Sequence, residues 1–315
     1  MLSRIANSLF WMGRYLERAE HTARYAKVHY FSSLDAPLVQ RKEFVMESIL
    51  NHSGILYDYQ KMHKTLEDEA VLYTITLQET NPLSIRACVN SARENARGAR
   101  DSISSELWEA INRLYHFVDS YPADDLADEG IYNFADKVIE NCVVVNGYVH
   151  KSLIHNEVWS FIHLGMHLER ANQITRILIT KTNDMLKAGT QKLGKVVENY
   201  QCVTLLKSAE AFDMSRTYYK AVPNYHDTLE FLVLNNDFPR SICYNLTRMS
   251  RYLDRINHSK VQEKDSLEFT IGKICATLHY LTIQEIEGDV LTFLNNMLAS
   301  INKIGELIER KYLNY

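Results

Sequence analysis

One phrase of this chain occurs twice, about half a chain apart, and this repeat restricts the fold more than any other feature of the sequence. MGRYLERAEHTAR at residues 12–24 aligns without gaps to LGMHLERANQITR at residues 164–176, an offset of 152. A second match, NPLSI at 81–85 to FPRSI at 238–242, follows in the same order at an offset of 157. Two ordered matches at nearly one offset indicate an internal duplication. We therefore predict a helical bundle built from two duplicated multi-helix halves.

The first repeated phrase keeps a glycine, a Leu-Glu-Arg-Ala string and a later arginine in both copies. The shared positions are Gly13/Gly165, Leu16/Leu168, Glu17/Glu169, Arg18/Arg170, Ala19/Ala171 and Arg24/Arg176. A solvated helix face has no reason to reproduce a Glu-Arg pair, although common descent of the halves preserves one. Two interpretations stay open: a substrate-handling site, and a buried Glu–Arg lock that holds the halves together.

An all-helical fold is the prediction for the whole chain. Its 315 residues include only 11 glycines and 5 prolines, below the typical usage of about 7% and 5%. The first segment carries an apolar stripe at alternating four- and three-residue steps, from Ile5 to Ala26, which is typical of a helix. We predict helices near residues 2–30, 40–60, 66–78, 82–102, 105–120, 130–154, 157–187, 193–219, 226–235, 239–260, 265–283 and 288–313.

The start of the second repeated phrase indicates a helix N-terminus. Asn81 is a good N-cap and Pro82 suits the first helical position, so we predict a helix that begins there. In the other copy Phe238 replaces the asparagine, and we expect a weaker cap or one supplied by Asp237.

Length and charge restrict the domain organisation and the partners. A chain of 315 residues exceeds one ordinary core, so we predict two halves, 1–150 and 151–315, packed as one compact unit. The net charge is −4 and the pI is about 6.3, which offers no basic excess for nucleic-acid binding. No stretch of about 18 apolar residues predicts a membrane span, and the N-terminus lacks the pattern of a signal peptide. Five scattered cysteines form no CxxC, as expected of a reduced cytoplasmic protein.

Polar residues on the first helix form the first candidate site. Arg14 and Glu17 are three residues apart, and Glu17 and His21 are four apart, so these side chains can touch. A solvated face held by weak surface pairs is the alternative to a working site. Glu17 is our catalytic candidate, and four further residues are candidates for ligand binding: Arg14, Arg18, Glu169 and Arg170.

An arginine ladder follows Pro82 and forms the second candidate site. Arg86, Arg93, Arg97 and Arg100 lie on one side of a predicted helix, and Glu94 relieves only part of their repulsion. Such a ladder binds a phosphate or carboxylate, or it pairs with acidic residues on other helices. Arg86, Arg93 and Arg97 are therefore candidates for ligand binding, and Glu94 is a second catalytic candidate. The second half has its own arginines instead: Arg240, Arg248, Arg251 and Arg255.

Metal and cofactor motifs are absent from the sequence. The Glu-x-x-His pairs of helical di-iron sites do not occur, and neither do Gly-rich phosphate loops or a G-x-S-x-G elbow. His163 and His167 have the spacing of two metal ligands, but Trp11 and Tyr15 occupy the matching positions of the first copy. We interpret the two histidines as packing groups and predict no cofactor.

The motifs together resemble a known family, the bacterial alpha-E proteins. MLSRIANSLFWMGRYLERAEHTAR, NPLSIRACVNSARENARGAR, LGMHLERA and FPRSI carry the resemblance, which covers nearly the whole chain. It implies an all-helical fold of unknown function with a characteristic glutamate, which matches Glu17 and its counterpart Glu169. The string from Arg93 to Arg97 matches the ARENAR pattern of the family.

The resemblance also implies partners, namely a circularly permuted ATP-grasp ligase and a transglutaminase-like protein. The function that follows is a helical component of a system that forms or modifies amide or peptide bonds. It would bind the ligase partner, or an anionic small molecule or peptide with a carboxylate or phosphate. Two alternatives remain, a structural module whose charge clusters lock the halves and a stand-alone acyl-transfer or hydrolytic enzyme. Whether the chain is itself an enzyme stays open.

Overall fold

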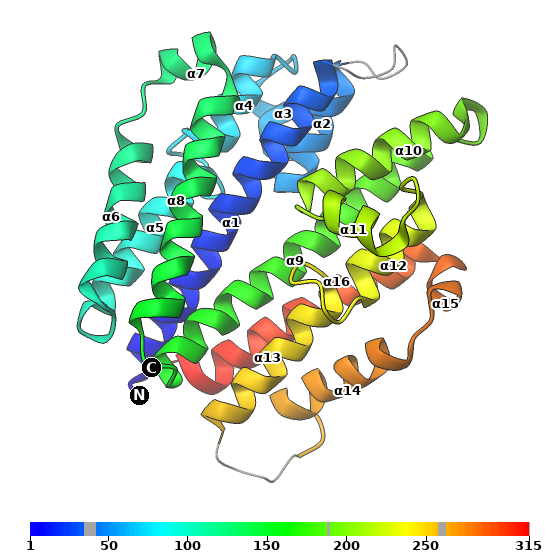
Figure 1. Cartoon of the computed structure of the whole chain (residues 1–315). Helices are drawn as coiled ribbons and strands as arrows, with labels where there is room; N and C mark the ends of the chain where they lie inside the picture. The colour runs from blue at the N-terminus through cyan, green and yellow to red at the C-terminus, as the bar shows by residue number, and fades with distance from the viewer. Residues whose placement is uncertain (35–41, 188–189, 258–262, 315) are drawn as a thin grey trace. The chain divides into compact units, whose positions relative to one another are not determined.

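Every regular element in the described part of the chain is a helix, which confirms the all-α prediction (Figure 1). The structure is a computed structural model that describes residues 1–34, 42–187, 190–257 and 263–314. Scarce glycine and proline leave long stretches in which helical hydrogen bonds continue. Helix α1 alone runs over Ser3–Leu34.

Contacts divide the chain into two compact units, and α1 contributes to both. Tyr15–Ile154 forms one unit, called here the α2–α8 unit. Met1–Arg14 and the chain from His155 onward form the other, called here the α9–α16 unit. The predicted halves 1–150 and 151–315 concern a duplication of the sequence, and that duplication stays a prediction.

In the α2–α8 unit, helix α6 packs against both α5 and α8, and its buried face includes Leu107, Ile111 and Leu114. Besides its part of α1, this unit contains α2 (Lys42–Ser53), α3 (Leu56–Met62), α4 (Asp68–Thr76), α5 (Ile85–Gly98), a 3-10 turn η1 (Arg100–Ser102), α6 (Ser105–Asp119), α7 (Ala123–Glu129) and α8 (Ile131–Ser152).

In the α9–α16 unit, helix α9 is central, and it packs on α13, α16 and α10 (Figure 1). Every residue from Trp159 to Glu169 is buried, as expected of a helix covered on all sides. The glutamate of the second Glu-Arg repeat therefore lies inside the protein. The helices are α9 (Glu157–Lys187), α10 (Thr190–Ser208), α11 (Phe212–Tyr219), α12 (Tyr225–Leu234), α13 (Ile242–Ile256), α14 (Leu267–Tyr280), α15 (Ile283–Glu287) and α16 (Val290–Ile308), followed by a π-helical turn, η2 (Glu309–Leu313).

The repeated glycines lie where α1 crosses α9. A Cβ atom on Gly13 would lie 2.4 Å from the carbonyl oxygen of Ile162, and one on Gly165 would lie 2.0 Å from that of Phe10. The two contacts are reciprocal, because Phe10 and Ile162 are 152 residues apart, as the two glycines are. Only glycine permits backbones to approach this closely. Close helix packing is thus the physical reason for a glycine at this position of each repeat.

The predicted cap of the helix after Pro82 is wrong, because α5 begins at Ile85 with Ser84 as its N-cap. The Ser84 hydroxyl accepts a hydrogen bond from the backbone N–H of Ala87. Asn81 instead stabilises the preceding turn, where its side chain binds Thr74 and Leu83.

The cap of the second copy is likewise a serine and not Asp237. Ser241 accepts a hydrogen bond from the backbone N–H of Tyr244 at the start of α13. Both repeats therefore use the serine of the Pro-x-Ser-Ile string, because its hydroxyl satisfies one of the unpaired N–H groups at a helix start.

Two predicted helices are each divided into two. The helix predicted near 40–60 is interrupted at Gly54, whose φ of 77° is left-handed, and its first two residues lie outside the described residues. The helix predicted near 193–219 is interrupted at Glu210, with a φ of 54°. A left-handed residue ends an α-helix because its backbone N–H no longer continues the ladder.

Candidate functional site

Glu169, the glutamate of the second repeat, is bound at both oxygens of its carboxylate. Its side chain is 1% exposed, and Oε2 accepts a hydrogen bond from Nε of Arg14 at 2.9 Å. Oε1 accepts another from Nε2 of Gln173 at 2.8 Å. The Arg14 guanidinium also lies 4.6 Å from the ring centroid of Trp11, a cation–π contact. The structure thus brings together two predicted site residues, Arg14 and Glu169, in a buried ion pair.

Glu17, the glutamate of the first repeat, is also buried. On the same helix the Glu20 carboxylate pairs with Arg24 at 2.5 Å. Burial raises the pKa of the Cys142 thiol on α8 well above its usual value, and the negative charges of Glu20 and Glu17 raise it further. Glu17 therefore lies in a buried polar cluster of the α2–α8 unit. Its neighbour Arg18 is half-buried, with its guanidinium 5.7 Å from the ring centroid of Tyr15.

Arg170 lies close enough to Tyr252 on α13 for its charge to act on the phenol. Burial raises the pKa of Tyr252, and the positive charges of Arg248, Arg255 and Arg170 oppose that shift. The side chain of Arg170 is half-buried. The two residues of the second Glu-Arg pair thus interact with different helices. Glu169 binds Arg14 on α1, and the charge of Arg170 acts on Tyr252 of α13.

His163 and His167 lie among aromatic rings. His163 is 4.1 Å from Trp159 and 5.3 Å from Tyr252, between ring centroids. The Nδ1 atom of His167 lies 2.7 Å from Oδ1 of Asn245. Within the described residues, no group of three or more His, Cys, Asp and Glu side chains is arranged to hold a metal ion.

The arginine ladder of α5 faces α6 and does not converge on one point. Arg86 donates from Nη2 to the carbonyl oxygens that end α6, those of Val118, Asp119 and Tyr121, each at 3.3 Å. The helix dipole favours a cation there. Arg86 also lies 3.7 Å from the exposed Glu79 carboxylate, and Arg100 reaches the carbonyl oxygen of Ile103. Backbone carbonyls, more than acidic partners on other helices, therefore satisfy these two arginines.

The middle of the ladder forms a local surface cluster. Arg93 donates from Nε to Oδ1 of Asn112 at 2.8 Å, and its guanidinium lies 4.4 Å from the ring centroid of Tyr115. Glu94 pairs with Arg93 at 3.2 Å and with Arg97 at 2.5 Å. Arg97 is 68% exposed. The contacts of Arg93, Glu94 and Arg97 stay on α5 and α6, so the structure does not join this cluster to Glu17 and Arg18 by direct contact.

All five cysteines are free thiols. Burial raises the pKa of Cys202 to about 12 and that of Cys275 to about 11, and it also raises the pKa of Cys243. A thiol nucleophile needs a lowered pKa. These three cysteines, like Cys142, therefore lack the chemistry of an acyl-transfer nucleophile.

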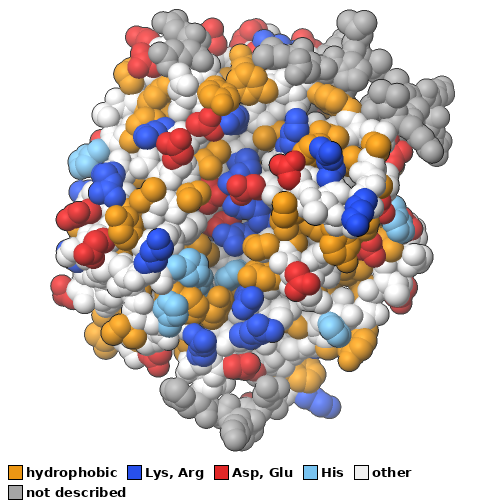
Figure 2. All heavy atoms as spheres, viewed as in Figure 1, with side chains coloured by type: hydrophobic (Ala, Val, Ile, Leu, Met, Phe, Trp, Pro, Cys, Tyr) orange, Lys and Arg blue, Asp and Glu red, His pale blue; other side chains and the backbone are white. Residues whose placement is uncertain are grey.

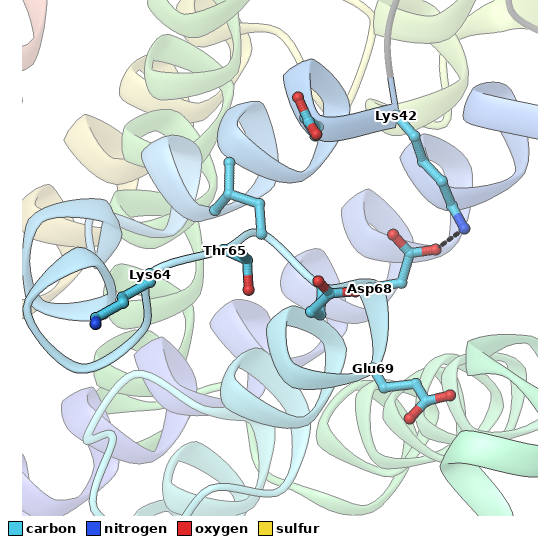
Figure 3. Close-up of a pocket in the computed structure, with 8 residues that line it drawn as sticks. Lys42, Lys64, Thr65, Asp68 and Glu69 are labelled. Atoms are coloured by element: carbon cyan, nitrogen blue, oxygen red, sulfur yellow. Dashed lines mark ion pairs between the residues drawn. The ribbon is translucent and has the colours of Figure 1, made fainter.

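Two large cavities lie away from the residues that the sequence nominated. One of about 790 Å³ lies in the α2–α8 unit, where Lys42 points toward Asp68 and pairs with it (Figure 3). Lys64 and Glu69 lie at its edges (Figure 3). The hydrogen bond from Asp68 raises the pKa of Lys42, so the lysine is already matched with a counter-charge.

The other cavity, of about 750 Å³, lies between α13 and α14 and contains Arg248 and Arg251. Both arginines are visible in the sequence, where no motif assigns them to a site. Spacing could have identified Arg248, because it has no acidic residue three or four positions away on its helix, whereas Arg251 has Asp254 three positions after it.

Fold and site together define an all-helical protein with Glu-Arg pairs whose glutamates are buried in its helix packing. The sequence pattern of the Alpha-E family, described as a predicted alpha-helical domain with a conserved ER motif, matches residues 1–313. The chain belongs to the Alpha-E family.

This chain is similar to mycobacterial proteins that are described as uncharacterized. One from Mycobacterium bovis and one from Mycobacterium tuberculosis are each 22% identical to it over 262 residues. The match covers 78% of this chain but only 29% of each relative, so the chain spans under a third of their length. No solved structure matches this chain. None of the helices in the described residues is long and apolar enough to cross a membrane.

Proposed function

We propose that this chain is the helical binding component of a cytoplasmic, ATP-grasp-linked system that forms or modifies amide bonds. It would bind the ligase partner, or a substrate with a carboxylate or phosphate group, while the ligase supplies the nucleotide chemistry. The resemblance to alpha-E proteins supplies the link to the ligase. The lack of any nucleotide-binding motif in the sequence agrees with this division of labour.

The observation that carries the proposal is the state of the Glu-Arg glutamate on α9. A general base must reach a substrate proton, whereas Glu169 is buried and both of its oxygens accept hydrogen bonds from protein groups. We infer that the repeated glutamates hold helices together. Binding is then assigned to accessible arginines, of which Arg97 on α5 is the most exposed of the predicted set.

A purely structural module is the second candidate, and the buried Arg14–Glu169 pair favours it equally. A stand-alone acyl-transfer enzyme has less support, because burial raises the pKa of the cysteine thiols and Glu94 is an exposed carboxylate shared by two arginines.

Two variants separate these candidates. Glu169→Gln leaves Arg14, whose side chain is 14% exposed, without its counter-charge, so we expect a loss of about 3–5 kcal/mol in the free energy of unfolding. Arg97→Gln changes an exposed side chain, and we expect its stability to stay within about 0.5 kcal/mol of the parent. Urea denaturation measures both effects. Product formation with the ATP-grasp partner is measured on the same samples, at a temperature where both variants are folded.

The proposal expects Arg97→Gln to lower product formation at unchanged stability, and Glu169→Gln to lower it only in proportion to the folded fraction. Arg113→Gln, an exposed arginine on α6, is the matched control for the loss of one charge. Unchanged product formation in Arg97→Gln would favour the structural module. A folded Glu169→Gln protein that forms no product would instead make Glu169 a catalytic residue and contradict the proposal.

A further inference from the structure

The cavity between α13 and α14 contains two arginines on one side and few groups that could neutralise them. Arg248 and Arg251 come from successive turns of α13, and His279 comes from α14. Asp237, which precedes α13, supplies the carboxylate of the lining. The volume of about 750 Å³ lies within the range of small-molecule sites.

Neither arginine of this cavity forms an ion pair within the residues that the structure describes. By contrast, Arg240, just before the same helix, pairs with Glu210 at 3.0 Å. Asp237 also lies too far from both cavity arginines to pair with either one. Two like charges three positions apart on a helix repel each other. Asp254 follows Arg251 by three positions but forms no ion pair with it in the described residues, so a bound anion would relieve this repulsion.

Positive charge extends beyond the cavity along α13. Figure 2 shows Lys and Arg side chains gathered over this helix, in the lower middle of the face drawn. Arg248 and Arg255 on α13, with Arg170 on α9, act together on the phenol of Tyr252. This field attracts an anion toward α13 before any contact forms.

Arg248 is held in position by an aromatic ring. Its guanidinium lies 4.8 Å from the ring centroid of Tyr244, which also lines the cavity. A cation–π contact of this kind fixes the guanidinium plane and leaves its N–H groups available. A pre-positioned guanidinium loses less rotamer entropy when a ligand binds.

We propose that the α13–α14 cavity binds the carboxylate group of a small molecule, with Arg248 and Arg251 as its ligands. A singly charged carboxylate fits better than a doubly charged phosphate, because the Asp237 carboxylate in the same cavity repels a second negative charge. The site lies on other residues than the α5 cluster. It rests on the proposed function and goes beyond it by adding a second site, with one ligand class, for the substrate.

Calorimetric titration of the full chain tests the site with three probes at constant ionic strength: acetate, N-acetylglycine and inorganic phosphate. We expect saturable binding of both carboxylates and binding of phosphate that is weaker by severalfold. Arg248→Gln and Arg251→Gln should each weaken carboxylate binding about tenfold. Asp237→Asn should reduce the difference in affinity between phosphate and acetate.

Arg255→Gln is the matched control, since Arg255 lies on α13 with its guanidinium 5.6 Å from the ring centroid of Trp159 and does not line the cavity. The Arg255→Gln variant should bind the carboxylate probes with an affinity within about twofold of that of the parent. An equal loss of carboxylate affinity in Arg255→Gln would show that the arginines act only through long-range electrostatic attraction, and it would contradict the proposed site. Failure of every probe to saturate would overturn it too, while tighter binding of phosphate than of acetate would overturn the carboxylate assignment.

The binding measurement tests the carboxylate site, and the product measurement tests the proposed function, so one hypothesis can be contradicted without the other. A result in which the Arg248 and Arg251 variants weaken carboxylate binding but leave the amount of product formed with the ligase unchanged would support the binding site. It would also show that the site has no role in the proposed function. Melting temperatures of all variants show that the proteins compared are folded.

Discussion

At the scale of single residues, α9 contains an ion pair that is removed from water. Lys181 and Asp184 lie 3.2 Å apart with side chains only 4% and 5% exposed. Burial lowers the pKa of Lys181, and the Asp184 carboxylate opposes this shift. Desolvation of two charges is expensive, so such a pair adds little net stability while it is intact, but the loss of one partner is severe.

We therefore expect Asp184→Asn to lower the free energy of unfolding by about 3–5 kcal/mol, measured by urea denaturation. Lys137 and Glu140 on α8 have the same spacing at 3.1 Å but are 55% and 66% exposed, so Glu140→Gln should cost under about 1 kcal/mol. A lowered lysine pKa means that the unfolded chain binds more protons, so the deficit of Asp184→Asn should shrink as the pH rises toward 10. Equal effects of the two substitutions would contradict this explanation.

A second residue pair predicts a dependence on pH. His226 on α12 shares a hydrogen bond with Glu287 on α15, 2.7 Å between Nδ1 and Oε1. This bond raises the pKa of His226 above its usual value, although slight burial opposes the shift. A raised pKa in the folded state means that the stabilisation is complete below the unfolded pKa, about 6.5, and is lost as the pH rises through the folded value.

The difference in melting temperature between the parent and Glu287→Gln should therefore be larger at pH 5.5 than at pH 8.5. Histidine NMR titration should show the pKa of His226 falling in the variant. A difference in melting temperature that is constant from pH 5.5 to 8.5 would show that the ion pair does not contribute.

The sequence nominated the Glu-Arg residues, but it did not show their burial. Arg14 and Glu17 lie opposite the apolar stripe of α1, a position that usually faces water. Periodicity reports which residues share a face and not what covers that face. Arg14 and Gln173 satisfy the buried Glu169 carboxylate. Gln173 lies four residues away on α9, but Arg14 comes from a distant segment, and such a partner is invisible in a local pattern.

At the scale of helices, the crossing of α1 and α9 depends on the absence of two side chains. Gly165→Ala would place a Cβ atom against the backbone of Phe10, which cannot move without displacing α1. We expect a loss of roughly 3 kcal/mol or more in the free energy of unfolding, measured by thermal or urea unfolding.

Gly272→Ala on α14 is the control in the same unit, since a Cβ atom there meets nothing within 4 Å. Alanine is the better helix former, so this variant should gain about 0.5–1 kcal/mol. A Gly165→Ala protein as stable as the parent would mean that the two backbones can separate at little cost.

The existence of helices was predictable from the sequence, but their ends and partners were less so. The apolar stripe of α1 and the scarcity of glycine indicated the fold class correctly. Asn81 was a plausible cap, yet Ser84 three residues later is the cap in the structure, because several turn residues in a row offer competing starts. The ladder of α5 was visible as a face, whereas its docking on the C-terminal carbonyls of α6 depends on tertiary packing.

At the scale of the whole molecule, the first fourteen residues belong to the unit formed by the second part of the chain. Leu9, Phe10 and Met12 are completely buried, and each such side chain contributes about 1.5–3 kcal/mol. Removal of Met1–Arg14 should therefore destabilise the α9–α16 unit selectively.

Hydrogen exchange measured by mass spectrometry tests this expectation on the shortened chain. Amides of α9 should lose protection by orders of magnitude, while those of α5 and α6 retain most of theirs, since exchange reports the stability of each cooperative region. Equal loss of protection in α5, α6 and α9 would show that the two units unfold together.

The assignment of Met1–Arg14 to the α9–α16 unit also fixes an order of events during synthesis on the ribosome. Segment 15–154 contains all of its own unit, so it can fold while translation continues. Residues 1–14 leave the ribosome before the segments that follow them, and α9 is made about 140 residues later, roughly seven to thirty seconds at ordinary translation rates. During that interval Leu9 and Phe10 remain without their native packing, and the nascent chain passes through a stage at which a chaperone has apolar side chains to bind.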